Sequence, residues 1–230
     1  MKHGMGFFVI VLVTAVVLSA CSSQPTSSPP IFFTPPPDAS IVGIQYELQP
    51  DGSVRIIDRT NGYGLILSAN WLPVLNNNQT IKDSAGSLAE IDPQLAELLT
   101  SSSNLNSQYR VLLFNTDDAH RDATMVSHIS VYVDSLFPSD MPLDSVVKQM
   151  ASGAASQGMA ENKNGIDYGY MSGEVTRQFS GKAVKLYTVL VLVKIDHGHV
   201  YLDISMPVSL AQKGHDLLQE VFDSIYLIDQ

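Results

Sequence analysis

The chain has 230 residues, with 13 basic and 23 acidic side chains and a formal net charge of −10. This balance excludes a nucleic-acid-binding role that depends on a basic surface, and it favours a soluble, self-repelling surface. The single cysteine, Cys21, excludes an intramolecular disulfide, so a folded domain must be stabilised by burial of apolar side chains. The roughly 190 residues that follow a proline-rich stretch suffice for one hydrophobic core.

The N-terminal residues have the layout of a secretory leader. Lys2 precedes an apolar run of twelve residues, 7–18, and small residues follow. This run is too short to cross a bilayer, which takes about twenty apolar residues. The next residues resemble the lipobox of bacterial lipoproteins: Leu18, Ser19, Ala20 and Cys21. The resemblance implies cleavage before Cys21 and diacylation of its thiol with acyl chains such as palmitate; the alternative is an ordinary secreted protein with a chance cysteine near its cleavage site.

The lipobox divides the chain into three expected parts. These are a signal peptide over residues 1–20, a lipidated cysteine with a Ser/Pro-rich tether over 21–40, and a single folded domain over 41–230. Loss of Lys2 with the leader leaves 12 basic and 23 acidic residues, a formal charge of −11. Two acyl chains hold a protein stably on a membrane, whereas one binds reversibly. We therefore expect a location on the extracytoplasmic face of the cell membrane or outer membrane.

The first third of the domain predicts short antiparallel strands. Residues 43–57 alternate apolar and polar side chains around Asp51-Gly52, which is a strong hairpin signal. Another strand is expected at 63–68. The only tryptophan, Trp71, is expected to fill the core at the bend that follows, where a proline two residues later prevents central-strand pairing.

The middle of the domain predicts a mixture of helices and strands. The polar segment 76–89 predicts a loop, and the leucine-rich segment 92–99 predicts a short helix that begins at an Asp-Pro pair. Segments 109–114 and 126–133 are rich in β-branched and aromatic residues and predict strands. Apolar residues then recur at helical spacing over 143–158, which predicts one helix of about four turns.

The last third predicts a long hairpin followed by a helix. A strand is expected at 174–179, and two apolar runs at 184–195 and 200–206 predict the hairpin. Ser209 is expected to cap the final helix, and residues 225–228 to form a closing strand. These elements predict an α+β fold.

Three segments give the domain a resemblance to the PsbP and Mog type, and it covers about residues 61–228. They are the strand and tryptophan bend over 63–71, Gly181-Lys182-Ala183 before the long hairpin, and Phe222-Asp223-Ser224-Ile225 before the last strand. The resemblance implies a three-layer α/β/α sandwich with a central, mainly antiparallel sheet. It also implies an accessory protein that docks on a larger assembly. Some photosynthetic members help to retain manganese and calcium, but this chain has no matching motif from which ligands could be transferred.

Two histidines are the most conspicuous candidate metal ligands. His197 and His199 flank a glycine in the predicted hairpin turn, and they could bind zinc or copper if Asp196, Asp203 or another strand completed the site. An exposed turn without metal is the favoured interpretation, because a zinc site needs three or four ligands. We therefore expect no metal and no cofactor. His128 is expected to be a core or edge residue and not a catalytic base.

The sequence carries no recognised catalytic motif. It lacks a nucleophile elbow, a complete phosphate-binding loop and a dinucleotide-binding fingerprint. The leading interpretation is therefore a noncatalytic, membrane-anchored binding or accessory module whose partner is an unknown protein or envelope component, and not nucleic acid. A small-ligand or metal-binding lipoprotein is the alternative. A hydrolase that uses carboxylates brought together by folding is a third possibility.

Overall fold

The computed structural model describes part of the chain. The described residues are 43–75, 78–89, 93, 96–97, 100, 109–123, 125–134, 136–152, 154–179, 182–212 and 214–228. The predicted signal peptide, lipobox and tether all lie outside these residues, so the structure does not address them. In the part of the chain that is described, no helix is both long enough and apolar enough to span a membrane.

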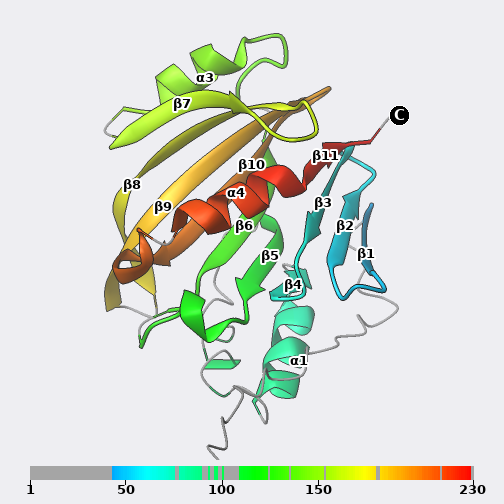
Figure 1. Cartoon of the computed structure of the whole chain (residues 1–230), viewed down its shortest axis with the longest axis vertical. Coiled ribbons are helices and arrows are strands. Elements are labelled where there is room, and N and C mark those ends of the chain that lie inside the picture. The colour runs from blue at the N-terminus through cyan, green and yellow to red at the C-terminus, as the bar shows by residue number, and fades with distance from the viewer. Residues whose placement is uncertain are drawn as a thin grey trace, which may run out of the picture.

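The centre of the fold is a seven-stranded sheet in which every neighbouring pair is antiparallel (Figure 1). Its spatial order is β4-β5-β6-β10-β9-β8-β7. The strands are β4 (Trp71–Leu75), β5 (Tyr109–Asn115), β6 (His128–Asp134), β7 (Ser156–Glu161), β8 (Asp167–Phe179), β9 (Lys182–Ile195) and β10 (Gly198–Pro207). Pro73 lies in β4, an edge strand, where its missing N–H group breaks no central pairing.

A second, four-stranded antiparallel sheet joins the two ends of the domain. Its order is β1-β2-β3-β11. The strands are β1 (Ile44–Leu48), β2 (Val54–Asp58), β3 (Tyr63–Leu67) and β11 (Ile225–Leu227). The turn between β1 and β2 contains Gly52 at a φ of 84°, a left-handed conformation that suits glycine. The C-terminal strand β11 thus pairs with β3, from the first third of the domain.

One face of the seven-stranded sheet is covered by apolar packing. The small sheet and helix α4 (Gly214–Ser224) share a hydrophobic core with this face, which we call the packed face. Representative members of the core are Ile56, Leu65, Val191, Leu202 and Val221. Figure 1 shows α4 lying across the sheet on this side.

The opposite face carries two helices, and we call it the outer face. Strand alternation directs its side chains away from the packed face, as in the cross-strand row Leu112, Ser130, Asp203, Leu190 and Met171. Helix α3 (Leu143–Met150) packs on one end of this face and α1 (Asn78–Leu88) on the other. Helices therefore lie on both faces of a central antiparallel sheet, so the predicted α+β class and three-layer α/β/α arrangement are confirmed, with the second sheet as an unpredicted addition.

Two predictions for the middle of the chain are wrong. Segment 76–89 was expected to be a loop, but residues 78–88 form α1, because Ala85 and Leu88 bury themselves against β4 and β5. The helix expected over 143–158 ends at Met150, and residues 156–161 form the edge strand β7, paired with β8. In both segments tertiary packing overrides a weak local pattern.

The other predicted elements have mixed outcomes. Ser209 does not cap α4, since it lies in the short 3₁₀ helix η3 (Val208–Leu210) and its hydroxyl donates to Asp122 at 3.1 Å. The predicted hairpins, the strands in the second half and the final helix are confirmed, and Trp71 is buried. In segment 92–99 the described residues are 93, 96 and 97, and all three are helical. The leucines of this segment lie outside the described residues.

An ion pair connects the two sheets. The Asp58 side chain on β2 is fully buried, and Arg110 on β5 donates to it through Nε at 2.7 Å and Nη2 at 3.4 Å. The side chain of Asn61 donates to the same carboxylate at 2.8 Å. A buried carboxylate needs such partners, because removal from water is costly.

A turn from the large sheet holds the C-terminal end of α4. Asn162, in the β7–β8 turn, donates from its side chain to the carbonyl oxygens of Phe222 and Ile225 at 2.9 and 3.0 Å. Its side-chain oxygen accepts from the backbone of Asn164 and Ile166. The turn therefore satisfies carbonyl groups that a helix end leaves unpaired.

We predict that Arg110→Met lowers the free energy of unfolding by about 3 kcal/mol, because it leaves the Asp58 carboxylate buried without its cation. Urea denaturation of the full chain measures this change. Lys148→Met is the matched control, since Lys148 pairs with Asp144 on the exposed surface of α3, and its loss should cost less than about 1 kcal/mol. Equal effects of the two substitutions would contradict a special role for the buried pair.

Candidate functional site: a pocket on the outer face

The part of the outer face between α3 and α1 carries polar side chains. His128 on β6, Ser205 on β10 and Thr188 on β9 form one cross-strand row, and Ser130 and Asp203 belong to the next. All five side chains are buried or nearly so. Buried polar groups are costly unless they are hydrogen-bonded, so a cluster of them on strands marks this region as a candidate site.

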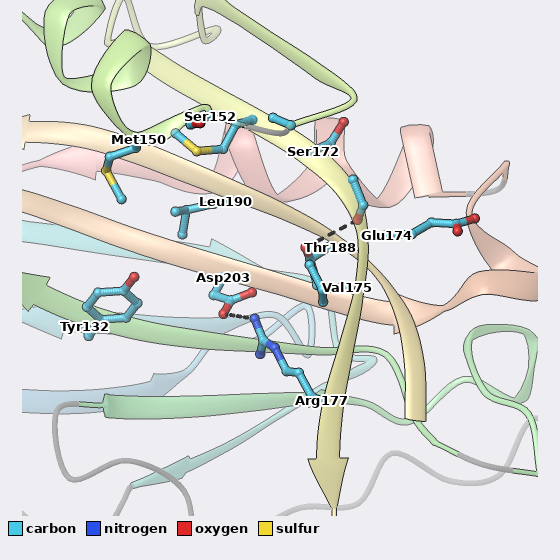
Figure 2. Close-up of a pocket in the computed structure, with 13 residues that line it drawn as sticks. Tyr132, Met150, Ser152, Ser172, Glu174, Val175, Arg177, Thr188, Leu190 and Asp203 are labelled. Carbon is cyan, nitrogen blue, oxygen red and sulfur yellow. Dashed lines mark hydrogen bonds and ion pairs between the residues drawn. The ribbon is translucent and has the colours of Figure 1, made fainter. Parts of the chain in front are cut away.

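A pocket of about 380 Å³ opens at this polar region, between the C-terminal end of α3 and four strands (Figure 2). Its volume is at the lower end of the range for small-molecule sites. The polar side chains that line it include Ser152, Glu174, Arg177, Thr188 and Asp203. The apolar ones include Tyr132, Met150, Met171, Val175 and Leu190. The lining is thus divided between charged and apolar groups.

The charged wall of the pocket is an ion pair between β8 and β10, the strands on either side of β9. Arg177 on β8 donates through Nη2 to Asp203 Oδ2 on β10 at 2.6 Å, as Figure 2 shows. Ser205 donates to the other oxygen of Asp203 at 3.3 Å. The Arg177 side chain is 33% exposed and that of Asp203 10%, so the guanidinium is the more accessible partner.

A second carboxylate at the pocket, that of Glu174, is paired with a cation outside it. Glu174 also lines the pocket, but it forms an ion pair with Lys185. In Figure 2 its side chain points away from Arg177 and Asp203. The local charge inside the pocket is therefore close to zero, with one cation and one anion side by side.

The apolar wall is built by α3 and the adjacent strands. Met150 belongs to the last turn of α3, while Met171 and Leu190 are cross-strand partners on β8 and β9. Tyr132 stacks on the buried ring of Tyr201, with 4.8 Å between ring centroids. The stacked rings make this side of the pocket rigid. The methionine side chains are flexible and can adapt to the shape of a ligand.

His128 lies beside the charged pair. Its Nδ1 is 3.1 Å from the carbonyl oxygen of Val126, which requires the proton to be on this nitrogen. Burial lowers the pKa of His128 below its ordinary value, the positive charge of Arg177 lowers it further, and Asp203 opposes the shift. The neutral ring is therefore the stable form in the folded protein, which agrees with the expectation of a core residue.

The polar groups of the pocket are engaged with one another. The hydroxyl of Ser205 is fully buried and donates to Asp203, so it is not presented to a substrate as a nucleophile. Arg177 and Asp203 bind each other. What the pocket offers a ligand is a set of hydrogen-bond donors and acceptors next to an apolar surface, the usual composition of a small-molecule site.

The histidines singled out in the sequence do not form a site together. His197 is exposed in the β9–β10 turn, whereas His199 is fully buried on β10, near Tyr201. Across the described residues, no group of three His, Cys, Asp or Glu side chains is placed to hold a metal ion. Cys21 and the other lipobox residues, Leu18, Ser19 and Ala20, lie outside the described part of the chain.

The pocket residues were missed from the sequence. Arg177, Thr188 and Asp203 lie on three strands. The register places Met171, not Arg177, in line with Asp203, so only the folded sheet and the length of the arginine side chain bring the ion pair together. The available signal was a pair of polar residues within apolar runs, Asp203 between Leu202 and Ile204, and Thr188 before Val189. A charged residue in the middle of a buried strand predicts a partner, but not which one.

We predict that acidification destabilises the protein in part through His128. Its lowered folded pKa means that the unfolded state binds protons more readily, so this contribution to stability is complete above about pH 6.5 and is lost as pH falls through the folded pKa. His128→Asn retains a donor for Val126, and it should reduce the loss of unfolding free energy between pH 7 and pH 5 in urea titrations. His197→Asn, at an exposed position, should leave that loss unchanged; the reverse ranking would refute the assignment.

No protein-family model matches the chain, and no curated protein matches it by sequence. Among solved structures, a cyanobacterial PsbP (CyanoP) from Synechocystis sp. PCC 6803 is similar, with a TM-score of 0.44 and 10% identity, over 82% of this chain and 94% of that one. LpqN, involved in cell envelope biogenesis of Mycobacterium tuberculosis, is similar with a TM-score of 0.40 and 8% identity, over 83% of this chain and 93% of that one. A PsbP structure is thus among those similar to this chain.

Proposed function

We propose that the protein is a lipid-anchored, noncatalytic binding module on the extracytoplasmic face of the cell envelope, and that it docks on a protein partner or envelope component. The observation that carries the proposal is the pocket on the outer face. The packed face is occupied by α4 and the small sheet, whereas the outer face keeps an accessible polar and apolar surface between its helices. A partner group that enters the pocket would meet both kinds of surface.

The noncatalytic part of the proposal rests on how the polar groups are used. The accessible cation, Arg177, is held by Asp203, and the nearby histidine is neutral with its Nδ1 proton directed at a backbone carbonyl. Such pairs fix the shape of a binding surface. They do not supply a free nucleophile or a poised general base.

The anchoring part of the proposal rests on the lipobox-like residues 18–21 and on the tether composition of residues 21–40. Acyl chains on Cys21 would hold the domain at a membrane surface without a spanning helix. The proline-rich tether would let the domain reach a partner at most about 60 Å from the membrane, since polyproline II advances about 3.1 Å per residue.

A small-ligand-binding lipoprotein is the second candidate. It is favoured by the volume of the pocket and by the division of its lining between Arg177 and Asp203 on one side and Met150, Met171 and Leu190 on the other. A surface that only docked on a flat partner would not require a pocket lined by both charged and apolar side chains.

We predict that Cys21→Ser abolishes incorporation of radioactive palmitate in intact cells and releases the chain from the membrane fraction, because no thiol remains to carry the lipid. Ser22→Ala is the control and should change neither readout. Membrane retention of the Cys21→Ser chain would contradict lipid anchoring at this residue.

We predict that a photo-crosslinking residue at Ser152 or Glu174, both exposed at the pocket, captures the same partner in intact cells. The matched control is Gln45, an exposed position on β1 of the small sheet. Mass spectrometry would identify the product. Absence of a product from both pocket positions, or an equal yield from Gln45, would contradict docking through the outer face.

A further inference from the structure

The pocket offers a recognition pattern for one chemical class of ligand. We propose that it binds a free α-amino acid with an apolar side chain, whose carboxylate contacts Arg177, whose ammonium contacts Asp203 and whose side chain lies on the apolar wall. This inference rests on the proposal that the protein is a binding module with its site at this pocket, and it specifies the ligand of that site.

The volume limits the group that can enter the pocket. At about 30 Å³ for each water-sized group, a pocket of about 380 Å³ holds roughly a dozen such groups. Phenylalanine has about that many non-hydrogen atoms and leucine is smaller, so either molecule fits. A folded peptide exceeds this space and could place only one of its side chains there.

The charges select a zwitterion. Arg177 uses Nη2 for Asp203, and a guanidinium has five N–H donors, so donors remain on its exposed side. Asp203 accepts from Arg177 and Ser205, and a carboxylate has about four lone-pair positions, so acceptor capacity remains as well. A ligand that carried only a negative charge would meet repulsion from Asp203, and one that carried only a positive charge would meet repulsion from Arg177. Adjacent opposite charges on the ligand satisfy both.

The apolar wall selects the side chain. Met150 and Leu190 are partly exposed around the pocket. Leu190 is the cross-strand partner of Asp203, and Figure 2 shows Met150 farther from the charged pair. An apolar side chain that covers these groups removes them from water, which is favourable. Thr188, whose hydroxyl donates to the Gly173 carbonyl oxygen at 3.4 Å, also lines the pocket.

Isothermal titration calorimetry of the full chain in detergent tests the proposal, with L-phenylalanine as the probe. Phenylpropionate lacks the ammonium group and phenylethylamine lacks the carboxylate, so each loses one charged contact. We expect saturable binding of phenylalanine and at least about tenfold weaker binding of each analogue, since each analogue loses a charge-assisted hydrogen bond. L-leucine should also bind, and L-aspartate should not.

Two variants separate recognition from stability. The double variant Arg177→Met with Asp203→Asn removes both charges together, so that no buried charge is left unpaired, and the new amide oxygen can still accept from Ser205. It should retain its unfolding midpoint in urea and lose phenylalanine affinity by at least about tenfold. Lys148→Met, which changes an exposed pair outside the pocket, should bind phenylalanine as the unsubstituted chain does.

Each result decides the matter. Absence of saturable heat with both phenylalanine and leucine, equal affinity for phenylpropionate, or undiminished affinity in the double variant would overturn the amino-acid proposal. If the crosslinking positions at the pocket still captured a partner in that case, the binding-module proposal would stand and only the ligand class would be wrong. If amino acids bound but no partner were captured, the docking role would be wrong and the ligand site would stand.

Discussion

The buried charge of Asp58 is the constraint on which the arrangement of the two sheets depends. A carboxylate without solvent contact must have a cation and donors around it, and Arg110 reaches it from the large sheet. The small sheet is therefore positioned by a directional interaction as well as by apolar packing, which has no direction. With the small sheet held in place, α4 and the packed face share one continuous core.

The two faces of the central sheet have consequently different roles. The packed face is covered by the core, since strands β6, β9 and β10 bury their alternate side chains there. The outer face is only partly covered, because α3 and α1 pack on its two ends. The polar residues between these helices would destabilise a closed core. At an accessible site their polar groups can contact solvent or a ligand. The main apolar core and the proposed binding site thus lie on opposite sides of the same strands.

Local sequence patterns account for much of the fold and little of the site. Asp51-Gly52 specifies its hairpin because the turn geometry is encoded by two adjacent residues. Helix α1 escaped prediction because its apolar residues are few. The helix is stabilised only where β4 and β5 cover those residues. The pocket escaped prediction for a related reason, since Arg177 on β8 meets Asp203 on β10 only in the folded sheet, across β9. His197 and His199 are close in sequence, yet one lies in a turn and the other in a buried strand.

The pairing of β11 with β3 determines when the domain can be completed. β3 lies between β2 and β11, so the small sheet lacks one of its strands until β11 is available. The side-chain hydrogen bonds of Asn162 likewise require the carbonyl groups at the end of α4. Contacts between such distant segments are formed late and slowly. The nascent chain therefore lacks a complete small sheet until β11 has been synthesised, so the first strands of the domain stay partly unpaired while the large sheet is being made.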